Sequence, residues 1–99
     1  MGNIFNTNNQ KLAVIRDDGT IWNTSGSKFG HISADHIYDK EGNKAGYMDA
    51  NGHVFNVSGS HIGTVQNTGG VHDIEGHHVG KVVGDHMEMG GAALLLLVR

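Results

Sequence analysis

The eight histidines are the residues of this 99-residue chain whose type is best suited to chemistry. Neutral imidazole is a good ligand for Zn²⁺, so histidines that converge in the fold would form a metal site. His77 and His78 are adjacent, but neighbouring residues of a strand point to opposite faces and do not easily share one ion. No H-x-x-x-H or H-E-x-x-H spacing occurs. The candidate ligands are therefore histidines at equivalent repeat positions, with solvent-facing side chains as the alternative interpretation: His61, His78, His36, His53 and His86.

Acidic turns and serines are the other candidates for chemistry. The segments 39–42 and 49–52 contain carboxylates that Ca²⁺ prefers, but neither continues into the run of oxygen ligands that ends an EF-hand loop. Asx turns account for the same residues. No serine lies in a G-x-S-x-G elbow, and the turn glycines are flanked by Ser25, Ser27, Ser58 and Ser60. We therefore predict no catalytic residue, no cofactor and no enzymatic activity.

An internal repeat of about 17 residues must position all of these side chains. Each copy opens with an apolar residue, a second residue that is usually aromatic, and Asn or Asp. Glycine follows at the sixth and tenth positions, and apolar residues at the ninth and twelfth. The clear copies span 21–36, 37–53, 54–70 and 71–87. Degraded copies, with other residues in place of the two glycines, span 4–20 and 87–99.

The repeat predicts one β-hairpin per copy. Apolar and aromatic pairs suit a half-buried strand, Asn or Asp opens a turn, and glycine supplies the positive φ that the turn needs. The tenth-position glycine lies inside the second strand, where we expect either a neighbouring aromatic ring over the bare backbone or a bulge. Because one hairpin cannot bury its apolar face, the copies must pack against one another, either around a central axis or along a line. A line leaves two exposed edges, so we favour closure around a pseudo-symmetry axis. We predict a single all-β domain, flower-like or barrel-like, over residues 1–99.

The apolar end of the chain fits the same register as a final strand. It has no polar residue at alternate positions, which favours burial on both faces, inside the domain or between subunits. As an interface it would support self-association through Leu94, Leu95, Leu96, Leu97 and Val98. A row of aromatic residues, Trp22, Tyr38 and Phe55, is either a binding face or a layer that covers glycine.

Charge and composition narrow the possible partners and the location. The formal charge is −3, the seven Lys and Arg are scattered, and no nucleic-acid surface is expected. No apolar run approaches the roughly 20 residues of a membrane-spanning helix, and no signal sequence is apparent, so we expect a cytoplasmic protein without membrane contact.

The pattern of triplet, glycine and apolar-Gly-x-apolar in residues 37–48 resembles the bacterial four-fold β-flower proteins. The resemblance covers residues 21–87. It implies four petal-like hairpins about a pseudo-four-fold axis, and it carries no established activity or catalytic motif to transfer. We therefore expect a noncatalytic structural or protein-interaction module, with a histidine-based metal-binding or small-ligand-binding β-domain as the alternative.

Overall fold

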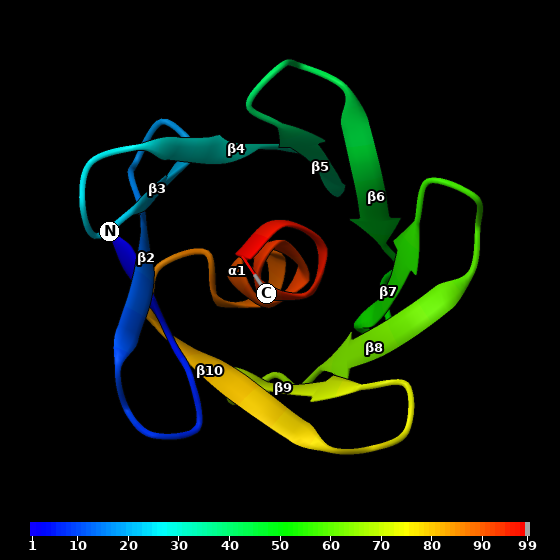
Figure 1. Cartoon of the computed structure of the whole chain (residues 1–99). Helices are drawn as coiled ribbons and strands as arrows, with labels where there is room; N and C mark the ends of the chain where they lie inside the picture. Colours follow the sequence, from blue (N-terminus) through cyan, green and yellow to red (C-terminus); the bar gives the residue numbers. More distant parts are fainter. Residues whose placement is uncertain (99) are drawn as a thin grey trace.

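A closed barrel of antiparallel strands surrounds a short helical segment (Figure 1). The computed structural model describes residues 1–98, and within them ten strands pair in chain order as hairpins 1 to 5, from β1–β2 to β9–β10. The ring is short and wide, at 30 × 30 × 19 Å. The elements are β1 (Gly2–Phe5), β2 (Lys11–Ile15), β3 (Thr20–Asn23), β4 (Lys28–Ser33), β5 (His36–Asp39), β6 (Lys44–Met48), β7 (His53–Asn56), β8 (His61–Val65), β9 (Gly70–Asp73), β10 (His78–Gly84), the α-helix α1 (Met87–Ala93) and the π-helix η1 (Leu94–Val98).

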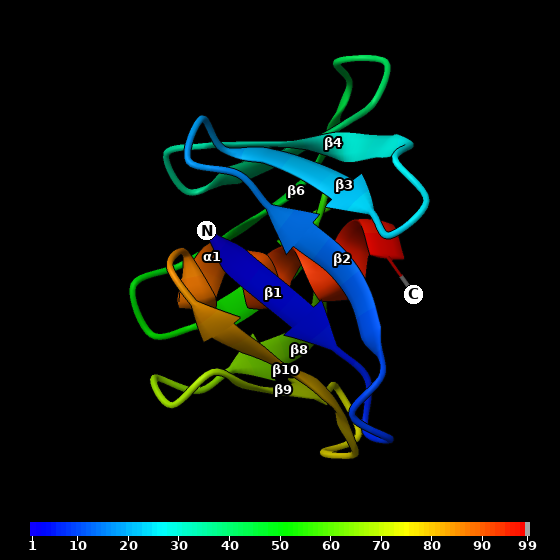
Figure 2. The same cartoon turned by 90° about the vertical axis from the view of Figure 1, so that its left-hand side faces the viewer.

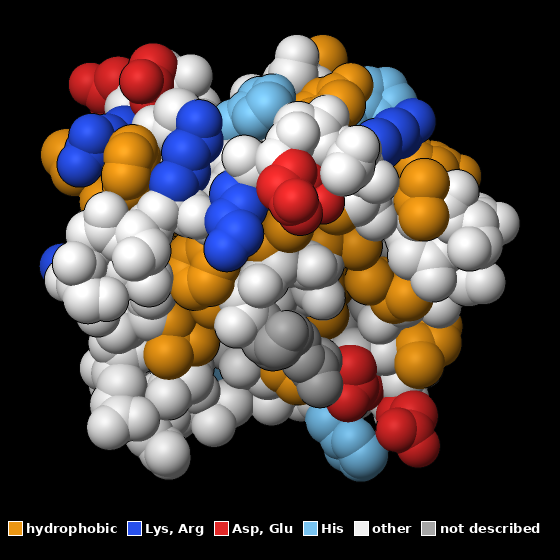
Figure 3. Space-filling view, turned by 45° about the horizontal axis from the view of Figure 1, so that its top comes forward, with side chains coloured by type: hydrophobic (Ala, Val, Ile, Leu, Met, Phe, Trp, Pro, Cys, Tyr) orange, Lys and Arg blue, Asp and Glu red, His pale blue; other side chains and the backbone are white. Residues whose placement is uncertain are grey.

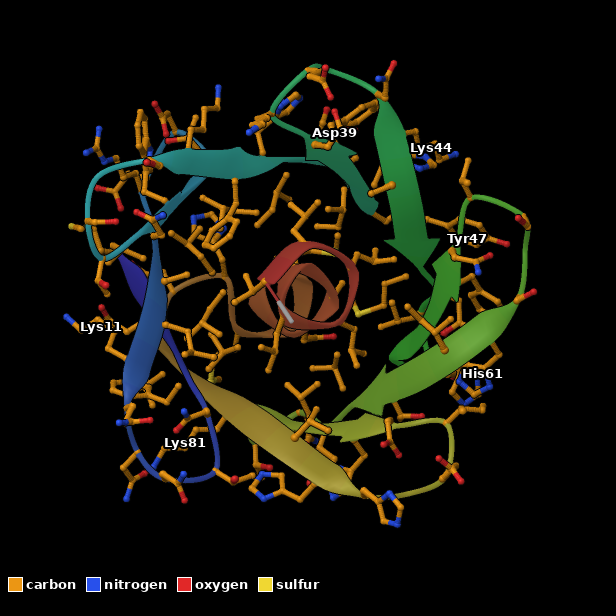
Figure 4. All side chains as sticks on the ribbon, viewed as in Figure 1. Lys11, Asp39, Lys44, Tyr47, His61 and Lys81 are labelled. Atoms are coloured by element: carbon orange, nitrogen blue, oxygen red, sulfur yellow. The ribbon has the colours of Figure 1, made fainter. Side chains whose placement is uncertain are left out.

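Two columns of the repeat form the core between the strands and the axis. Successive strand residues point alternately inward and outward, so the first residue of each triplet and the apolar residue at the twelfth position face the helix. Figure 4 shows the side chains that fill this space. The first column is completely buried and consists of Ile4, Ile21, Ile37, Val54 and Val71. The all-β repeat fold expected from the sequence is therefore confirmed.

The ring has five hairpins within the described residues, so the expected four-fold arrangement is wrong. The degraded copy 4–20 forms hairpin 1 and the turn after it, and β1 closes the ring by pairing with β10 from Gly2↔Gly84 to Phe5↔Lys81. Asn9 replaces the turn glycine and still adopts φ 64°. Asn tolerates this left-handed conformation because its short polar side chain bonds locally. The copy at 4–20 is thus a complete structural unit.

The copy expected at 87–99 does not form a hairpin. Its residues form α1 and η1, so the final strand expected at the end of the chain is wrong. Pairing of β1 with β10 leaves no open strand edge for another strand to join. A segment enclosed by the ring must satisfy its own backbone polar groups, which a helix does. Glycines let this helical segment fit inside the ring. A methyl group at Gly90 would lie 2.6 Å from Ile15 Cδ1, and one at Gly91 would lie 2.6 Å from Val65 Cγ2. Arg99, the last residue of that expected copy, lies outside the described residues.

The two open ends of the ring differ in what borders them. The side view in Figure 2 places the hairpin tips at the end where η1 finishes, which we call the tip mouth. The turns that link successive hairpins lie at the other end, the link mouth, where α1 begins. Neither helix among residues 1–98 has the length and apolar character required to cross a bilayer.

Candidate functional site

The C-terminal leucines meet the tenth-position glycines one by one inside the ring. A methyl group at Gly80 would lie 2.7 Å from Leu94 Cδ2, and one at Gly63 would lie 2.7 Å from Leu95 Cδ1. The same holds at the next hairpins, where a methyl group at Gly46 would lie 2.8 Å from Leu96 Cδ1 and one at Gly30 would lie 2.9 Å from Leu97 Cδ1. Each glycine thus leaves room for one leucine.

The π-helical form of η1 suits this one-to-one arrangement. Five hairpins around a ring are spaced by about 72°, whereas an α-helix turns by about 100° per residue. A π-helix, whose hydrogen bonds join residues five apart, has a wider turn and rotates less per residue. Consecutive residues from Leu94 to Leu97 therefore face consecutive hairpins, in the order 5, 4, 3, 2.

Of the two expectations for the tenth-position glycine, the bulge is confirmed and the covering aromatic ring is wrong. The strand register shifts beside this position in each hairpin, for example between Ile37 and Tyr38, which pair with Gly46 and Lys44. The tenth-position glycines are buried on the inner face of the strands, whereas the aromatic column lies on the outer face. The covering side chains are leucines of η1.

The predicted interface residues fall into two groups. Leu94 and Leu95 are 1% and 9% exposed and pack inside the ring, which removes them from any outer surface of this chain. Leu96, Leu97 and Val98 are half-buried at the tip mouth. Self-association through those three residues stays a prediction.

The histidines proposed as metal ligands are spread over hairpins 3, 4 and 5 and the residue before α1, on the outside of the molecule. His53 and His61 lie together, with ring centroids 4.9 Å apart. His36 lies 3.3 Å from the carboxylate of Asp35, and His61 Nε2 is 2.8 Å from the carbonyl oxygen of Gly63. His78 contacts the ring of His72, at 5.2 Å between centroids, and His86 has φ 61° before α1. The structure thus joins one pair of the five candidates.

Aromatic and histidine rings form a continuous row along the outer face from β4 to β8. Neighbouring rings contact in the order His31, Tyr38, His36, Tyr47, Phe55, His61 and His53, with centroid separations from 4.9 to 6.5 Å. In Figure 4, Tyr47 and His61 point away from the central helix. Stacked cross-strand pairs such as Tyr47 and Phe55 cover each other's faces, so the row forms a layer over the outer side of these strands.

The hairpin tips are Asx turns, as expected for their Asn and Asp residues. Asn56 Oδ1 accepts the backbone N–H groups of Ser58 and Ser60, each at 3.0 Å, and Asp39 does the same for Glu41 and Asn43. The link turn at 49–52 is built in this way as well. The backbone N–H of His53 is the main cause that holds the pKa of Asp49 below its ordinary value.

One tip carries a cluster that sequence reasoning missed. Asp73, Glu75 and His77 each offer a ligand atom, and these atoms lie within 4.8 Å of one another. Among the described residues, this is the one group of three such side chains whose ligand atoms lie close enough together to hold a metal ion. The pattern Asp-x-Glu-x-His is visible in the sequence at residues 73–77, but Asp73 entered the prediction only as the Asp that opens the turn of its copy.

Apolar side chains gather at the tip mouth (Figure 3). The three half-buried residues of η1 are surrounded by a ring at the ninth repeat position, Leu12, Phe29, Ala45, Ile62 and Val79. A groove of about 350 Å³ lies at the tip of hairpin 5. It is lined by Ile62, Ile74 and Leu95 together with the acidic residues Asp73 and Glu75. Val57 and Ile74, at equivalent places in hairpins 4 and 5, are 66% and 57% exposed.

The profile of one protein family, described as "5-fold beta-flower protein", matches residues 1–96 of the chain. The match covers every hairpin and most of the central helical segment. No curated protein and no solved structure is significantly similar to this chain.

Proposed function

The chain belongs to the 5-fold beta-flower family, and from this premise we propose that it is a noncatalytic interaction module whose partner is a second copy of the same chain. The family is described by the shape of its fold. The four-fold assignment from the sequence was therefore right in kind and wrong in the number of petals. A scaffold of repeated hairpins defines a surface before it defines a reaction.

The placement of the reactive side chains supports the noncatalytic part of the proposal. Ser25 donates through its hydroxyl to Asn23 within its own turn, and the N–H groups of Ser58 and Ser60 donate to Asn56. These serines thus flank turns at hairpin tips. Seven of the eight histidines contact rings, carboxylates or a carbonyl oxygen on the outer face.

The tip mouth is the surface that supports an interaction. Val57 and Ile74 occupy turn positions where hairpins 1 and 2 have Thr7 and Thr24, so the turn itself does not require an apolar side chain. Ile74 lines a groove together with Leu95 of η1, and Val57 is exposed at the same place on the neighbouring tip. Apolar patches of this kind are typical of contact surfaces in soluble proteins.

Charge around the tip mouth favours a second copy as the occupant. Hairpin 5 carries Asp73 and Glu75 at its tip, whereas Lys11 and Lys28 follow the tips of hairpins 1 and 2. In a two-fold contact the same surface meets itself, so an acidic tip of one copy can lie opposite a basic tip of the other. This complementarity would orient the apolar areas against each other.

Sedimentation analysis tests the proposal. We expect the wild-type chain to sediment as a dimer and the double variant V57T/I74T as a monomer, because threonine keeps the β-branched shape and removes the apolar surface. Val83 is 49% exposed on β10, outside the tips, so V83T is the matched control and should remain dimeric. A monomeric wild-type chain at all accessible concentrations, or an unaltered dimer in V57T/I74T, would contradict the proposal.

A further inference from the structure

We propose that the tip of hairpin 5 binds a divalent metal ion of the Zn²⁺ class through Asp73, Glu75 and His77. The three ligand atoms already lie within 4.8 Å of one another. Ligands of a tetrahedral Zn²⁺ ion at about 2.1 Å are separated by about 3.4 Å, so a small movement completes the set. The exposed side chains of Glu75 and His77 are free to make that movement.

The turn fixes the first ligand in place. Asp73 Oδ1 accepts the backbone N–H groups of Glu75 and His77 at 3.0 and 2.9 Å, and the side chain is 17% exposed. Oδ2 is thereby directed toward His77 Nδ1, at 3.5 Å. The backbone N–H of Asp73 donates to the carbonyl of His77, which closes the loop. All three ligand residues thus belong to one hydrogen-bonded turn.

Comparison with hairpin 3 separates what the turn requires from what a metal requires. Its tip, residues 39–43, has the same hydrogen bonds, with Asp39 Oδ1 accepting from Glu41 and Asn43 at 2.9 Å. The two tips share Asp, Glu and Gly at equivalent positions, and Asn43 stands where hairpin 5 has His77. The turn therefore forms without histidine, and the nitrogen ligand is an addition that turn geometry does not explain.

The ligand set points to a metal ion of borderline softness, such as Zn²⁺, and not to the hard ion Ca²⁺. One imidazole and two carboxylates match the donors that Zn²⁺ accepts, whereas Ca²⁺ takes six to eight oxygen ligands. Three protein ligands leave a position of the tetrahedron for water. All three come from five consecutive residues, so binding needs no distant part of the chain to close on the ion.

Calorimetric titration of the untagged protein with zinc chloride tests the site, with amide chemical shifts locating it. We expect one binding event, shifts centred on residues 73–77, and at least a tenfold loss of affinity in H77N. That variant copies the tip of hairpin 3, so its turn should fold normally. E75Q should also weaken binding.

The control is H86N, which removes an exposed histidine outside the tip and should bind zinc as the wild type does. Equal affinity in H77N and the wild type would overturn the proposal. Absence of heat, or shifts centred on the rings of His53 and His61, would overturn it as well.

Discussion

The inner face of the ring and the hairpin tips follow the same repeat, yet they differ in what each position tolerates. Inside, the first column holds only isoleucine and valine, and four of the five tenth positions are glycine. At the tips, the sixth position of the repeat is always glycine or asparagine. The fourth position varies widely, from threonine to lysine, valine and isoleucine. Packing around the axis constrains the first region, whereas the Asx turn, with its Asn or Asp acceptor and its positive φ, constrains the second. Differences among hairpins that bear on function should therefore be found at the tips.

Shortening a leucine at the axis should have the largest effect on stability. Leu94 is 1% exposed beside Gly80, and L94A leaves a cavity in the closed ring, which should lower the free energy of unfolding by about 3 kcal/mol. Leu97 is half-buried at the tip mouth, so L97A should cost less than about 2 kcal/mol. Urea denaturation of both variants measures the difference. Equal losses would mean that the interior does not distinguish the two ends of η1.

Adding a methyl group to the glycine column should have the next largest effect. In G46A the new methyl group would meet the carbonyl oxygen of Phe55 and both terminal methyl groups of Leu96, and we expect a loss of about 2 kcal/mol. Alanine already occupies this column at Ala13, so the matched variant A13G should cost no more than about 1 kcal/mol. Thermal denaturation followed by circular dichroism compares them. A neutral G46A would show that the close approach is not needed.

Acidification should affect the turns outside the ring, with the smallest change. Hydrogen bonding lowers the pKa of Asp49, mainly through the backbone N–H of His53, and lowers that of Asp18, mainly through the hydroxyl of Thr20. A carboxyl whose folded pKa is depressed stabilises the fold above its unfolded pKa of about 3.9, and this contribution is lost as pH falls through the folded value.

The melting temperature should therefore decline below about pH 4. D49N keeps the turn acceptor and removes the titration, so its decline should be shallower. Parallel profiles for D49N and the wild type would show that the Asp49 turn contributes nothing to the pH dependence.

Much of the barrel could be predicted from sequence, because the repeat columns carry both the alternation of the strands and the chemistry of the turns. The number of petals was missed because copies were counted by their glycines. Asn9 performs the turn role with φ 64°, and Ala13 fits the tenth column with its side chain fully buried. Substitutions that keep the conformation made a complete hairpin look degraded.

The central helix was missed for a different physical reason. Leu95 and Val98 fitted the ninth and twelfth columns of a hairpin, but a spacing of three residues also places side chains on one face of a helix. Sequence alone does not reveal that β1 and β10 close the ring and exclude another strand. The role of the tenth glycine depends on that helix, so its leucine partners were equally out of reach.

The candidate site at Asp73, Glu75 and His77 was missed although its residues were in view. The predicted ligands were histidines at equivalent positions of different repeat copies, whereas the cluster lies within one five-residue turn. Asx-turn chemistry explains Asp73, and His77 was compared only with its neighbour His78 and not with the carboxylates of its own turn.

The central claim is that η1 lies on the ring axis with one leucine against the glycine of each successive hairpin. Nuclear Overhauser contacts between leucine methyl groups and glycine Hα protons test it directly. The account predicts cross-peaks that pair Leu94 with Gly80, Leu95 with Gly63, Leu96 with Gly46 and Leu97 with Gly30. Backbone contacts between residues 94–98 and a neighbouring strand, without these methyl contacts, would contradict it.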